Sequence, residues 1–564
     1  MERIRLSHYD EGVPARLDYP DGPLQGLLES AAQEHPDNIA TVFFGARMTY
    51  REVDDKANRL AHALQELGLA KGDRVALVLP NCPQFVVAYY AVLKAGGVVV
   101  PTNPTYKPRE FQHQFADAGA RIVISLDMFV PPIQEIQSST EVGQIIVTHV
   151  QDYLPTALSY LYPIKARREG TAVHTPRAPG IHGFSELIRR TDPHYTPVPV
   201  APTDLAVLQY TGGTTGVSKG AMLTHRNLLA NAYQVRAWLP DARLGGGEVF
   251  LAVTPFFHVY GMSVVMNFAL AVAGSMVLLP RFNTKEVLHA ITRYKATTFG
   301  GVPTMYIAIN NFPDIKKYDL SSIKACISGA MPLPVEVAQQ FEQLTNGRLR
   351  EGYGLTEASP VTHCNPVYRP PKVGSGGVPF PDVDAKIVDL EDGHDLPQGD
   401  VGELAVRGPQ IMAGYWNRPD ETAAVLRDGW LLTGDCARMD EDGYFYIVDR
   451  KKDLIIAAGF NIYPRDVEEV LYEHPAVLEA VVAGVPDAYR GETVKAYIVL
   501  KEGMKATEDE ITAFCRERMA GFKVPRIVEF RESLPKSLIG KHLRRVLIEE
   551  ERAKLAATPS EGAA

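Results

Sequence analysis

Short apolar runs alternate with helical patterns along the first part of the chain. The runs at residues 74–79 (RVALVL) and 98–101 (VVVP) are typical of buried strands, and residues 84–95 between them predict a helix. Residues 121–125 (RIVIS) predict a further strand. Strands that alternate with helices predict an α/β fold of mostly parallel sheets flanked by helices on both faces.

The pattern recurs at residues 249–280, where VFLAVTP and SMVLLP enclose a helical pattern at 262–273. This segment contains no Asp, Glu, Lys or Arg. A membrane span needs about 20 apolar residues in succession. Because Pro255, His258 and Gly261 interrupt the apolar run, we expect a buried strand, loop, helix and strand.

Residues 152–190 break the alternation. Here aromatic residues mix with a basic cluster at Lys165, Arg167 and Arg168. The favoured interpretation is a surface excursion that packs on its own domain. Contact with a membrane surface is the alternative.

A second pattern begins after DRKKD at residues 449–453. VLEAVVAGVP and VKAYIVL predict strands, and residues 508–519 predict a helix. This is enough for a small α+β domain. We therefore expect a large N-terminal domain at residues 1–449 and a small C-terminal domain at 450–564, with the junction near Lys452.

Composition limits the classes of partner. The chain has 564 residues, a net charge of −9, and five cysteines without a CxxC pair. An acidic balance gives no electrostatic case for nucleic acid, and the cysteine spacing indicates neither zinc nor a disulfide framework. The opening MERIRLSHYDEG has no apolar run, so we expect no secretory signal and a cytoplasmic location.

The clearest candidate chemistry is the polar loop YTGGTTGVSKGAMLTH at residues 210–225. Glycines, hydroxyls and one lysine offer several donors to anionic oxygens. It is not a Walker A loop, because Val217 and Ser218 separate Gly216 from Lys219. A phosphate-binding loop is the favoured interpretation, and an ordinary polar turn is the alternative.

Four later stretches carry further candidates. GYGLTE contains Tyr353 and Glu357, LLTGD contains Asp435, DRKKD supplies Arg450, and LIGKHLRR supplies Lys541. Taken singly, each has a structural alternative: a core tyrosine, a capping or solvated carboxylate, or a surface lysine. These alternatives weaken when the stretches are considered together and in order.

In that order, the motifs resemble those of the acyl-adenylate-forming superfamily, which contains acyl-CoA synthetases, luciferases and peptide-synthetase adenylation domains. The resemblance covers about residues 49–545 and includes GYWNRPDET, DGWLLTGD and GFNIYPRDVE. The chain looks most like bacterial long-chain fatty-acid–CoA ligases. It departs from the common motifs at Gly213, Ser218 and Ile539, where Ser, Pro, and Ser or Thr are usual.

The resemblance implies a two-step reaction. A carboxylate attacks the α-phosphorus of ATP, which gives an acyl-AMP and releases pyrophosphate. The acyl group then passes to the thiol of coenzyme A, and AMP leaves. Mg²⁺ would neutralise charge on the phosphates. The small domain would pivot at Lys452 between the two steps.

The resemblance also implies site residues. Lys541 would bridge the carboxylate and the α-phosphate in the first step, Thr356 would donate to the α-phosphate, and His258 would line the acyl site and gate it. Glu357 would bind Mg²⁺, with Thr211 a weaker second ligand. The β,γ-phosphates would contact Thr211, Gly212, Gly213, Thr214, Thr215, Gly216 and Lys219. Adenine and ribose would contact Tyr353, Gly329, Ala330, Asp435 and Arg450, and the pantetheine of coenzyme A would contact Gly459 and Phe460.

The substrates follow from local composition. No acidic residue occurs between Glu248 and Glu286, so a substrate ammonium would find no partner there. A fatty tail gains about 0.8 kcal/mol per buried CH₂, which favours a medium- or long-chain fatty acid over an aryl acid. No GGxS carrier motif occurs, which favours free coenzyme A as the acceptor.

Three other functions stay open at this point. They are a luciferase-like oxygenase, a stand-alone enzyme that loads an acid onto a separate carrier protein, and a non-catalytic lipid-binding protein with a degenerate site. A homodimer and peripheral contact with the inner face of the membrane are further expectations.

Overall fold

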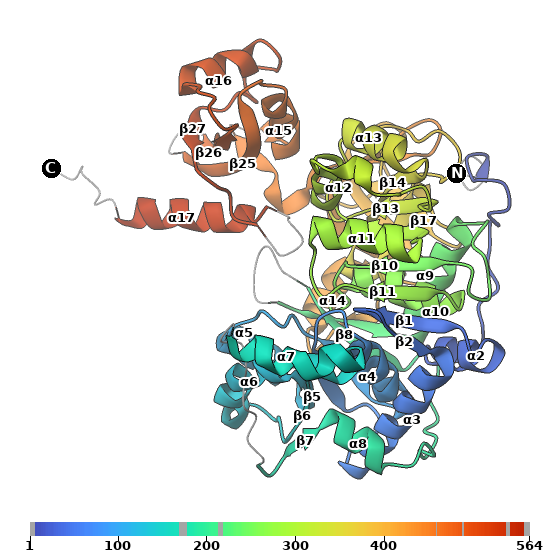
Figure 1. Cartoon of the computed structure of the whole chain (residues 1–564). Helices are drawn as coiled ribbons and strands as arrows, with labels where there is room; N and C mark the ends of the chain where they lie inside the picture. The colour runs from blue at the N-terminus through green and yellow to red at the C-terminus, as the bar shows by residue number, and fades with distance from the viewer. Residues whose placement is uncertain are drawn as a thin grey trace. The chain divides into compact units, whose positions relative to one another are not determined.

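The computed structural model describes residues 6–168, 178–211, 218–457, 460–487, 490–536 and 542–557. The chain forms two compact units (Figure 1). The first comprises the described residues of 1–211, 218–384 and 407–431, and the second comprises those of 385–406 and 432–564. Each unit has its own sheets and hydrophobic core.

One sheet of the first unit has the strand order β19-β9-β8-β4-β3-β5-β6-β7. Its pairs are parallel from β8 to β7, whereas β9 pairs antiparallel with both β8 and β19. Helices α5 and α6 cover one of its faces with a buried aromatic and aliphatic cluster. Its strands are β3 (Arg74–Val78), β4 (Val98–Pro101), β5 (Ala120–Leu126), β6 (Gln144–Thr148), β7 (Ile181–Gly183), β8 (Leu205–Tyr210), β9 (Gly220–Thr224) and β19 (Gly414–Tyr415).

The other sheet of the first unit has the order β16-β15-β14-β13-β12-β10-β11-β1-β2. Its central pairs are parallel, and helices α11, α12 and α13 pack on one face. Its strands are β1 (Ile39–Phe43), β2 (Ala46–Thr49), β10 (Val249–Ala252), β11 (Ser275–Leu278), β12 (Thr298–Gly301), β13 (Ala325–Ser328), β14 (Arg348–Gly354), β15 (Val361–Cys364) and β16 (Val378–Pro379).

The helices of the first unit begin at recognisable signals. Thr49 and Glu52 form a capping box at the start of α3, and Pro83 opens α4. The α-helices are α2 (Gly26–Glu34), α3 (Tyr50–Glu66), α4 (Pro83–Lys94), α5 (Pro108–Ala118), α6 (Val130–Ile136), α7 (Thr156–Arg168), α8 (Phe184–Arg190), α9 (His225–Trp238), α10 (Phe268–Ala271), α11 (Thr284–Tyr294), α12 (Pro303–Asn310), α13 (Val335–Thr345) and α14 (Pro419–Val425). Shorter turns are η1 (Asp127–Phe129), η2 (Gln137–Ser139), η3 (Val150–Tyr153), the π-helical η4 (Gly261–Asn267), η5 (Ile315–Lys317) and η6 (Thr356–Ala358).

The second unit contains the sheet β24-β23-β26-β25, with β27 beside β26, whose core is closed by α15 and α16. Strands β17, β18, β21 and β20 form a further sheet, of which β20 and the first two residues of β21 belong to the first unit, and β22 pairs with β21. These strands are β17 (Asp384–Val388), β18 (Gly402–Arg407), β20 (Leu426–Arg427), β21 (Trp430–Met439), β22 (Phe445–Arg450), β23 (Ile455–Ala457), β24 (Phe460–Ile462), β25 (Val477–Asp487), β26 (Gly491–Leu500) and β27 (Ile527–Phe530). The helices are η7 (Lys451–Asp453), α15 (Pro464–Tyr472), α16 (Glu508–Arg516) and α17 (Arg544–Ala557).

The α/β fold with a C-terminal sheet domain confirms the predicted class. Differences are local: the strand predicted from residue 249 ends at Ala252, and residues 262–273 form the π-turn η4 and the short α10 rather than one α-helix. The boundary at 449/450 stays a prediction. Among the described residues, no helix has both the length and the apolar character needed to cross a membrane.

Candidate adenylation site

The phosphate-loop candidate lies between β8 and β9. Its described ends are held together, because the backbone N–H of Thr211 donates to the carbonyl of Lys219 at 2.9 Å. The Ser218 hydroxyl donates to the carbonyl of Thr211 at 2.6 Å. Gly212, Gly213, Thr214, Thr215 and Gly216 lie outside the described residues.

Lys219 contacts a segment that is remote in sequence. Its ammonium forms an ion pair with Glu421, at the start of α14, and lies 5.1 Å from the centroid of the Tyr415 ring. The side chains of Lys219 and Glu421 are 36% and 40% exposed. A phosphate could therefore reach the ammonium from solvent.

Glu357 lies on η6, directly after β14, and contacts the same tyrosine. The Tyr415 hydroxyl donates to Oε1 of Glu357 at 2.7 Å, and the backbone N–H of Met412 donates to the Glu357 carbonyl at 2.8 Å. Burial and the Glu357 charge raise the pKa of Tyr415, so its hydroxyl stays a donor at neutral pH. A half-buried carboxylate held in this way is the oxygen ligand that Mg²⁺ prefers, and Glu357 therefore fits the metal.

The adenine candidates lie at the carboxyl ends of two neighbouring strands. β13 and β14 are parallel, with Ser328 opposite Glu351, so Gly329 and Ala330 emerge at the same edge as Tyr353. This is the edge at which α/β sheets bind ligands. The Tyr353 ring meets the His363 ring edge to face, with centroids 5.9 Å apart.

His258 lies in the turn between β10 and η4. Asn81 fixes this turn by donating to the carbonyls of Ala252 and Thr254, at 3.0 and 2.9 Å, and by accepting from the N–H of Phe256 at 2.8 Å. Phe256, Val259 and Tyr260 are buried, and so is the whole of η4, which is mostly apolar apart from Ser263 and Asn267. The structure thus places His258 beside an apolar region.

Gly261, the first residue of η4, has no room for a side chain. A Cβ there would lie 2.3 Å from the carbonyl oxygen of Pro255. The close approach of the two backbone segments therefore requires glycine.

Asp435 and Arg450 come together in the second unit. They are opposite residues of the antiparallel strands β21 and β22, with Nε of Arg450 3.7 Å from Oδ1 of Asp435. Phe460 is the first residue of β24. Lys541 and Gly459 lie outside the described residues.

The segment that contains Lys452 is bordered by an ion-pair cluster. Arg544 of α17 contacts Asp453 at 2.8 Å, Glu468 at 2.7 Å and Asp449 at 3.6 Å. Burial raises the pKa of Asp449 to about 6, although the Arg544 charge opposes that shift. Lys452 itself is exposed at the centre of η7, between the two aspartates that Arg544 contacts.

Sequence reasoning did not single out Tyr415, Glu421 or Arg544, which contact or flank the candidate residues in the structure. A signal existed for the first two, since both belong to the motif GYWNRPDET, to which no role was given. Their partners lie some 60 to 200 positions away and become neighbours only through strand pairing.

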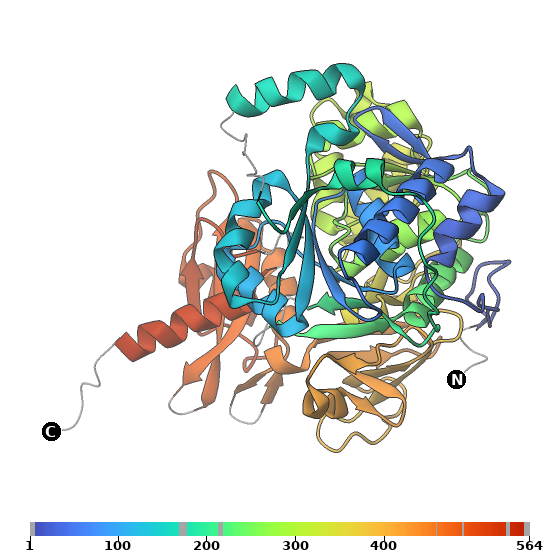
Figure 2. The ribbon, with the colours of Figure 1, turned by 90° about the horizontal axis from the view of Figure 1, so that it is seen from below.

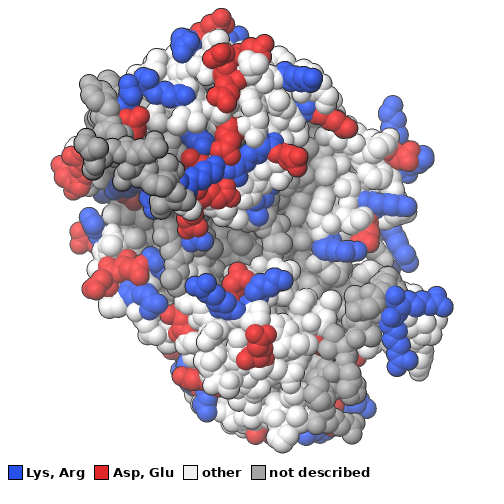
Figure 3. All heavy atoms as spheres, turned by 90° about the vertical axis from the view of Figure 1, so that its left-hand side faces the viewer, with Lys and Arg blue, Asp and Glu red and all other residues white. Residues whose placement is uncertain are grey.

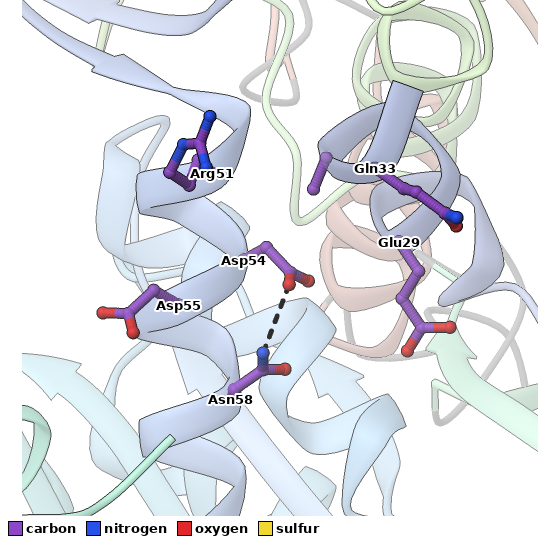
Figure 4. Close-up of a pocket in the computed structure, with 7 residues that line it drawn as sticks. Glu29, Gln33, Arg51, Asp54, Asp55 and Asn58 are labelled. Atoms are coloured by element: carbon purple, nitrogen blue, oxygen red, sulfur yellow. Dashed lines mark hydrogen bonds between the residues drawn. The ribbon is translucent and has the colours of Figure 1, made fainter. Parts of the chain in front are cut away.

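A separate pocket of the first unit lies between α2 and α3 (Figure 4). Beside it, the buried ammonium of Lys94 lies 2.9 Å from carboxylate oxygens of both Glu29 and Asp54. This ion-paired cluster joins α2, α3 and α4, so we assign it a structural role. The pocket is lined by Glu29, Ala32, Gln33, Arg51, Asp54, Asp55 and Asn58, none of which is a predicted site residue.

Two family models match the chain. Residues 28–416 match that of an AMP-binding enzyme, and residues 466–541 match that of an AMP-binding enzyme C-terminal domain. Together they include all the candidate residues except Asp435, Arg450, Gly459 and Phe460, which fall between the two matches.

Similar proteins extend over almost the whole chain. A long-chain-fatty-acid–CoA ligase of Bacillus subtilis is 50% identical over 97% of this chain and 98% of its own length. A ligase of the same name from Escherichia coli is 40% identical over 98% of this chain and 99% of its own. The solved structure of ATP-bound MatB from Rhodopseudomonas palustris has a TM-score of 0.82 and 30% identity, and the match covers 94% of this chain and 99% of MatB.

Proposed function

This chain belongs to the AMP-binding enzyme family. From that premise, we propose which of its residues act in each step of a fatty-acid–CoA ligase reaction. The enzyme activates a fatty acid with ATP to acyl-AMP and pyrophosphate, and then transfers the acyl group to coenzyme A. The observation that carries this function is the 50% identity with a long-chain ligase over 97% of the chain. ATP, Mg²⁺ and coenzyme A are its cofactors and co-substrate.

We assign the β,γ-phosphates of ATP to the loop from Thr211 to Lys219, and the metal to Glu357 of the first unit. Bound Mg²⁺ neutralises charge on the phosphate oxygens. Tyr415 orients the Glu357 carboxylate, and Tyr353 with Gly329 and Ala330 holds the base at the carboxyl edge of β13 and β14. Thr356, next to Glu357 on η6, donates to the α-phosphate, and the apolar turn with His258 receives the acyl group.

Within the second unit, Asp435 accepts from the ribose hydroxyls, and Arg450 beside it holds that carboxylate. Lys541 acts in adenylation, and Gly459 with Phe460 guides the pantetheine in thioester formation. The boundary at 449/450 and the pivot at Lys452 belong to the same proposal. Transfer to a separate carrier protein and a non-catalytic lipid-binding role are not favoured.

The preferred chain length is tested by a series of acids from acetate to palmitate, compared by kcat/KM. We expect kcat/KM to rise with length through the medium and long chains, because each buried CH₂ contributes about 0.8 kcal/mol. Activity confined to acids of four carbons or fewer would overturn the assignment of a medium- or long-chain fatty acid as the substrate. A preference for aryl acids would instead identify an aryl acid as the substrate.

We also propose that the enzyme contacts the membrane through α7. On this helix Leu158, Tyr160, Leu161 and Ile164 are 45%, 76%, 59% and 53% exposed, and Arg167 and Arg168 continue the exposed surface. Figure 2 shows α7 at the outer edge of the first unit. Exposed apolar side chains beside arginines fit a bilayer with anionic headgroups, where a long-chain substrate also partitions.

The double substitution L161E/I164E is expected to lower binding to phosphatidylglycerol vesicles at least about tenfold, because it places charge where apolar side chains would enter the bilayer. Leu244→Glu is the matched control, since Leu244 is also exposed (58%) but belongs to the connection between α9 and β10. Vesicle co-sedimentation provides the measurement. Equal binding of the double variant and the control would contradict the role of α7.

A homodimer and a cytoplasmic location complete the proposal. All five cysteines lie within the described residues, where they are buried and unpaired, as in a reducing compartment. On the face drawn in Figure 3, acidic and basic side chains are interspersed, as is usual for a protein exposed to solvent. Sedimentation velocity of the wild type and of L161E/I164E tests the dimer and shows whether α7 takes part in it.

A further inference from the structure

The segment from Gly414 to Thr422 contacts both Glu357, the proposed metal ligand, and Lys219, the proposed phosphate-loop lysine. Its strand β19 pairs antiparallel with β9, with Tyr415 opposite Ala221, so it runs beside the strand that leaves the phosphate loop. On the other side, Met412 binds the backbone of Glu357, and Tyr415 binds its carboxylate. One short segment thus contacts both the metal-ligand candidate and the phosphate-loop lysine.

Several hydrogen bonds fix this segment. The backbone N–H of Trp416 donates to the Gly220 carbonyl at 2.8 Å. Arg418 donates to one oxygen of Asp117 at 2.8 Å, and the other oxygen accepts from the hydroxyl of Tyr210, the residue before Thr211, at 2.7 Å. The segment is therefore bound directly to β9 and, through Asp117, to the end of β8.

Thr422 fixes the start of α14. Its hydroxyl oxygen accepts from the Tyr415 N–H and donates to the Arg418 carbonyl, both at 2.8 Å. Glu421 precedes Thr422 in the first turn of this helix, so the backbone that carries the Glu421 side chain is fixed. It forms the ion pair with Lys219, while Nε of Arg418 lies 3.8 Å from its Oε1.

We propose that Glu421 is a positioning residue that pairs with Lys219 and competes with the β,γ-phosphates of ATP for its ammonium. This rests on the proposed role of Lys219 as the phosphate-loop lysine. One ammonium cannot remain paired with Glu421 and fully neutralise a phosphate, and the Glu421 carboxylate repels the incoming anion. When pyrophosphate leaves, Glu421 pairs with Lys219 again, which favours release.

Glu421→Gln removes this competition. Asp420→Asn is the matched control, because it deletes the same charge one position earlier on α14, at an exposed residue. In fatty-acid-dependent exchange of pyrophosphate into ATP, we expect E421Q to lower the KM for ATP and the inhibition constant of pyrophosphate about fivefold, the scale of one exposed ion pair. E421D, which keeps the charge, should retain wild-type values for both constants, and so should D420N.

The outcomes distinguish a failure of the proposed ligase function from a failure of the role proposed for Glu421. If wild-type enzyme shows no fatty-acid-dependent exchange, the proposed function fails. If wild-type enzyme exchanges but E421Q behaves as D420N, or if E421Q raises the KM for ATP, then the competition between Glu421 and ATP is refuted and the function stands. Loss of a folded structure would appear as an earlier thermal transition, and Glu421→Ala then provides the second variant for the same two constants.

Discussion

Replacing Lys541 by alanine is expected to slow the formation of acyl-AMP by about 10²–10³-fold. In the proposed mechanism its ammonium meets negative charge that develops at the α-phosphate. The loss of one such preorganised contact costs about 3–4 kcal/mol in the transition state. Thioester formation from supplied acyl-AMP should continue, because Lys541 has no part in that step.

Single-turnover kinetics of each half-reaction provide the measurement. Lys536→Ala is a matched control from the same stretch, since Lys536 pairs with Glu479 in the second unit and has no assigned role. We expect the control to adenylate normally. If K541A slowed both half-reactions equally while still folding, the role assigned to Lys541 would be wrong.

Lys452→Pro is expected to have the opposite effect: near-normal release of pyrophosphate in the first turnover, and acyl transfer to coenzyme A slowed at least about tenfold, or roughly 1.4 kcal/mol. Lys541 and Gly459 belong to the same small domain but serve different steps, so that domain must move between them. A hinge absorbs such motion as φ/ψ changes at a few residues. Proline fixes φ near −65° and restricts the preceding residue, which should trap the adenylating orientation.

Lys452→Ala is the control, because it removes the side chain without fixing φ. The backbone on either side of η7 is extended, with φ −98° and ψ 134° at Arg450 and φ −58° and ψ 127° at Leu454. Rapid-quench measurement of acyl-CoA formation decides the question. Wild-type rates of thioester formation in K452P would require the pivot to be moved to another residue.

Much of the α/β core could be predicted from the sequence because its strands are short apolar runs that are buried on both faces. The predicted strands at 98–101 and 121–125 correspond to β4 and β5 for this reason. The prediction of a helix at 262–273 was less accurate, because apolar periodicity does not distinguish an α-helix from the π-helical η4. η4 begins at Gly261, where the backbone packs tightly against Pro255.

The site was predictable only in part. The motifs predicted Glu357, Lys219, Asp435 and Arg450 as site residues, and pairing of β21 with β22 places the last two side by side. The motifs could not reveal that Tyr415 binds Glu357 or that Glu421 binds Lys219. These contacts depend on the pairing of β19 with β9, which lies about 190 positions earlier in the chain. Likewise, sequence alone favoured packing of residues 152–190 on their own domain, whereas α7 exposes four large apolar side chains.

This enzyme joins a fatty acid to coenzyme A through an acyl-adenylate. The most direct test incubates the purified protein with ATP, Mg²⁺, palmitate and coenzyme A and quantifies every product. We expect palmitoyl-CoA, AMP and pyrophosphate in equal amounts, and palmitoyl-AMP when coenzyme A is omitted. Formation of ADP and phosphate in place of AMP and pyrophosphate would contradict this reaction.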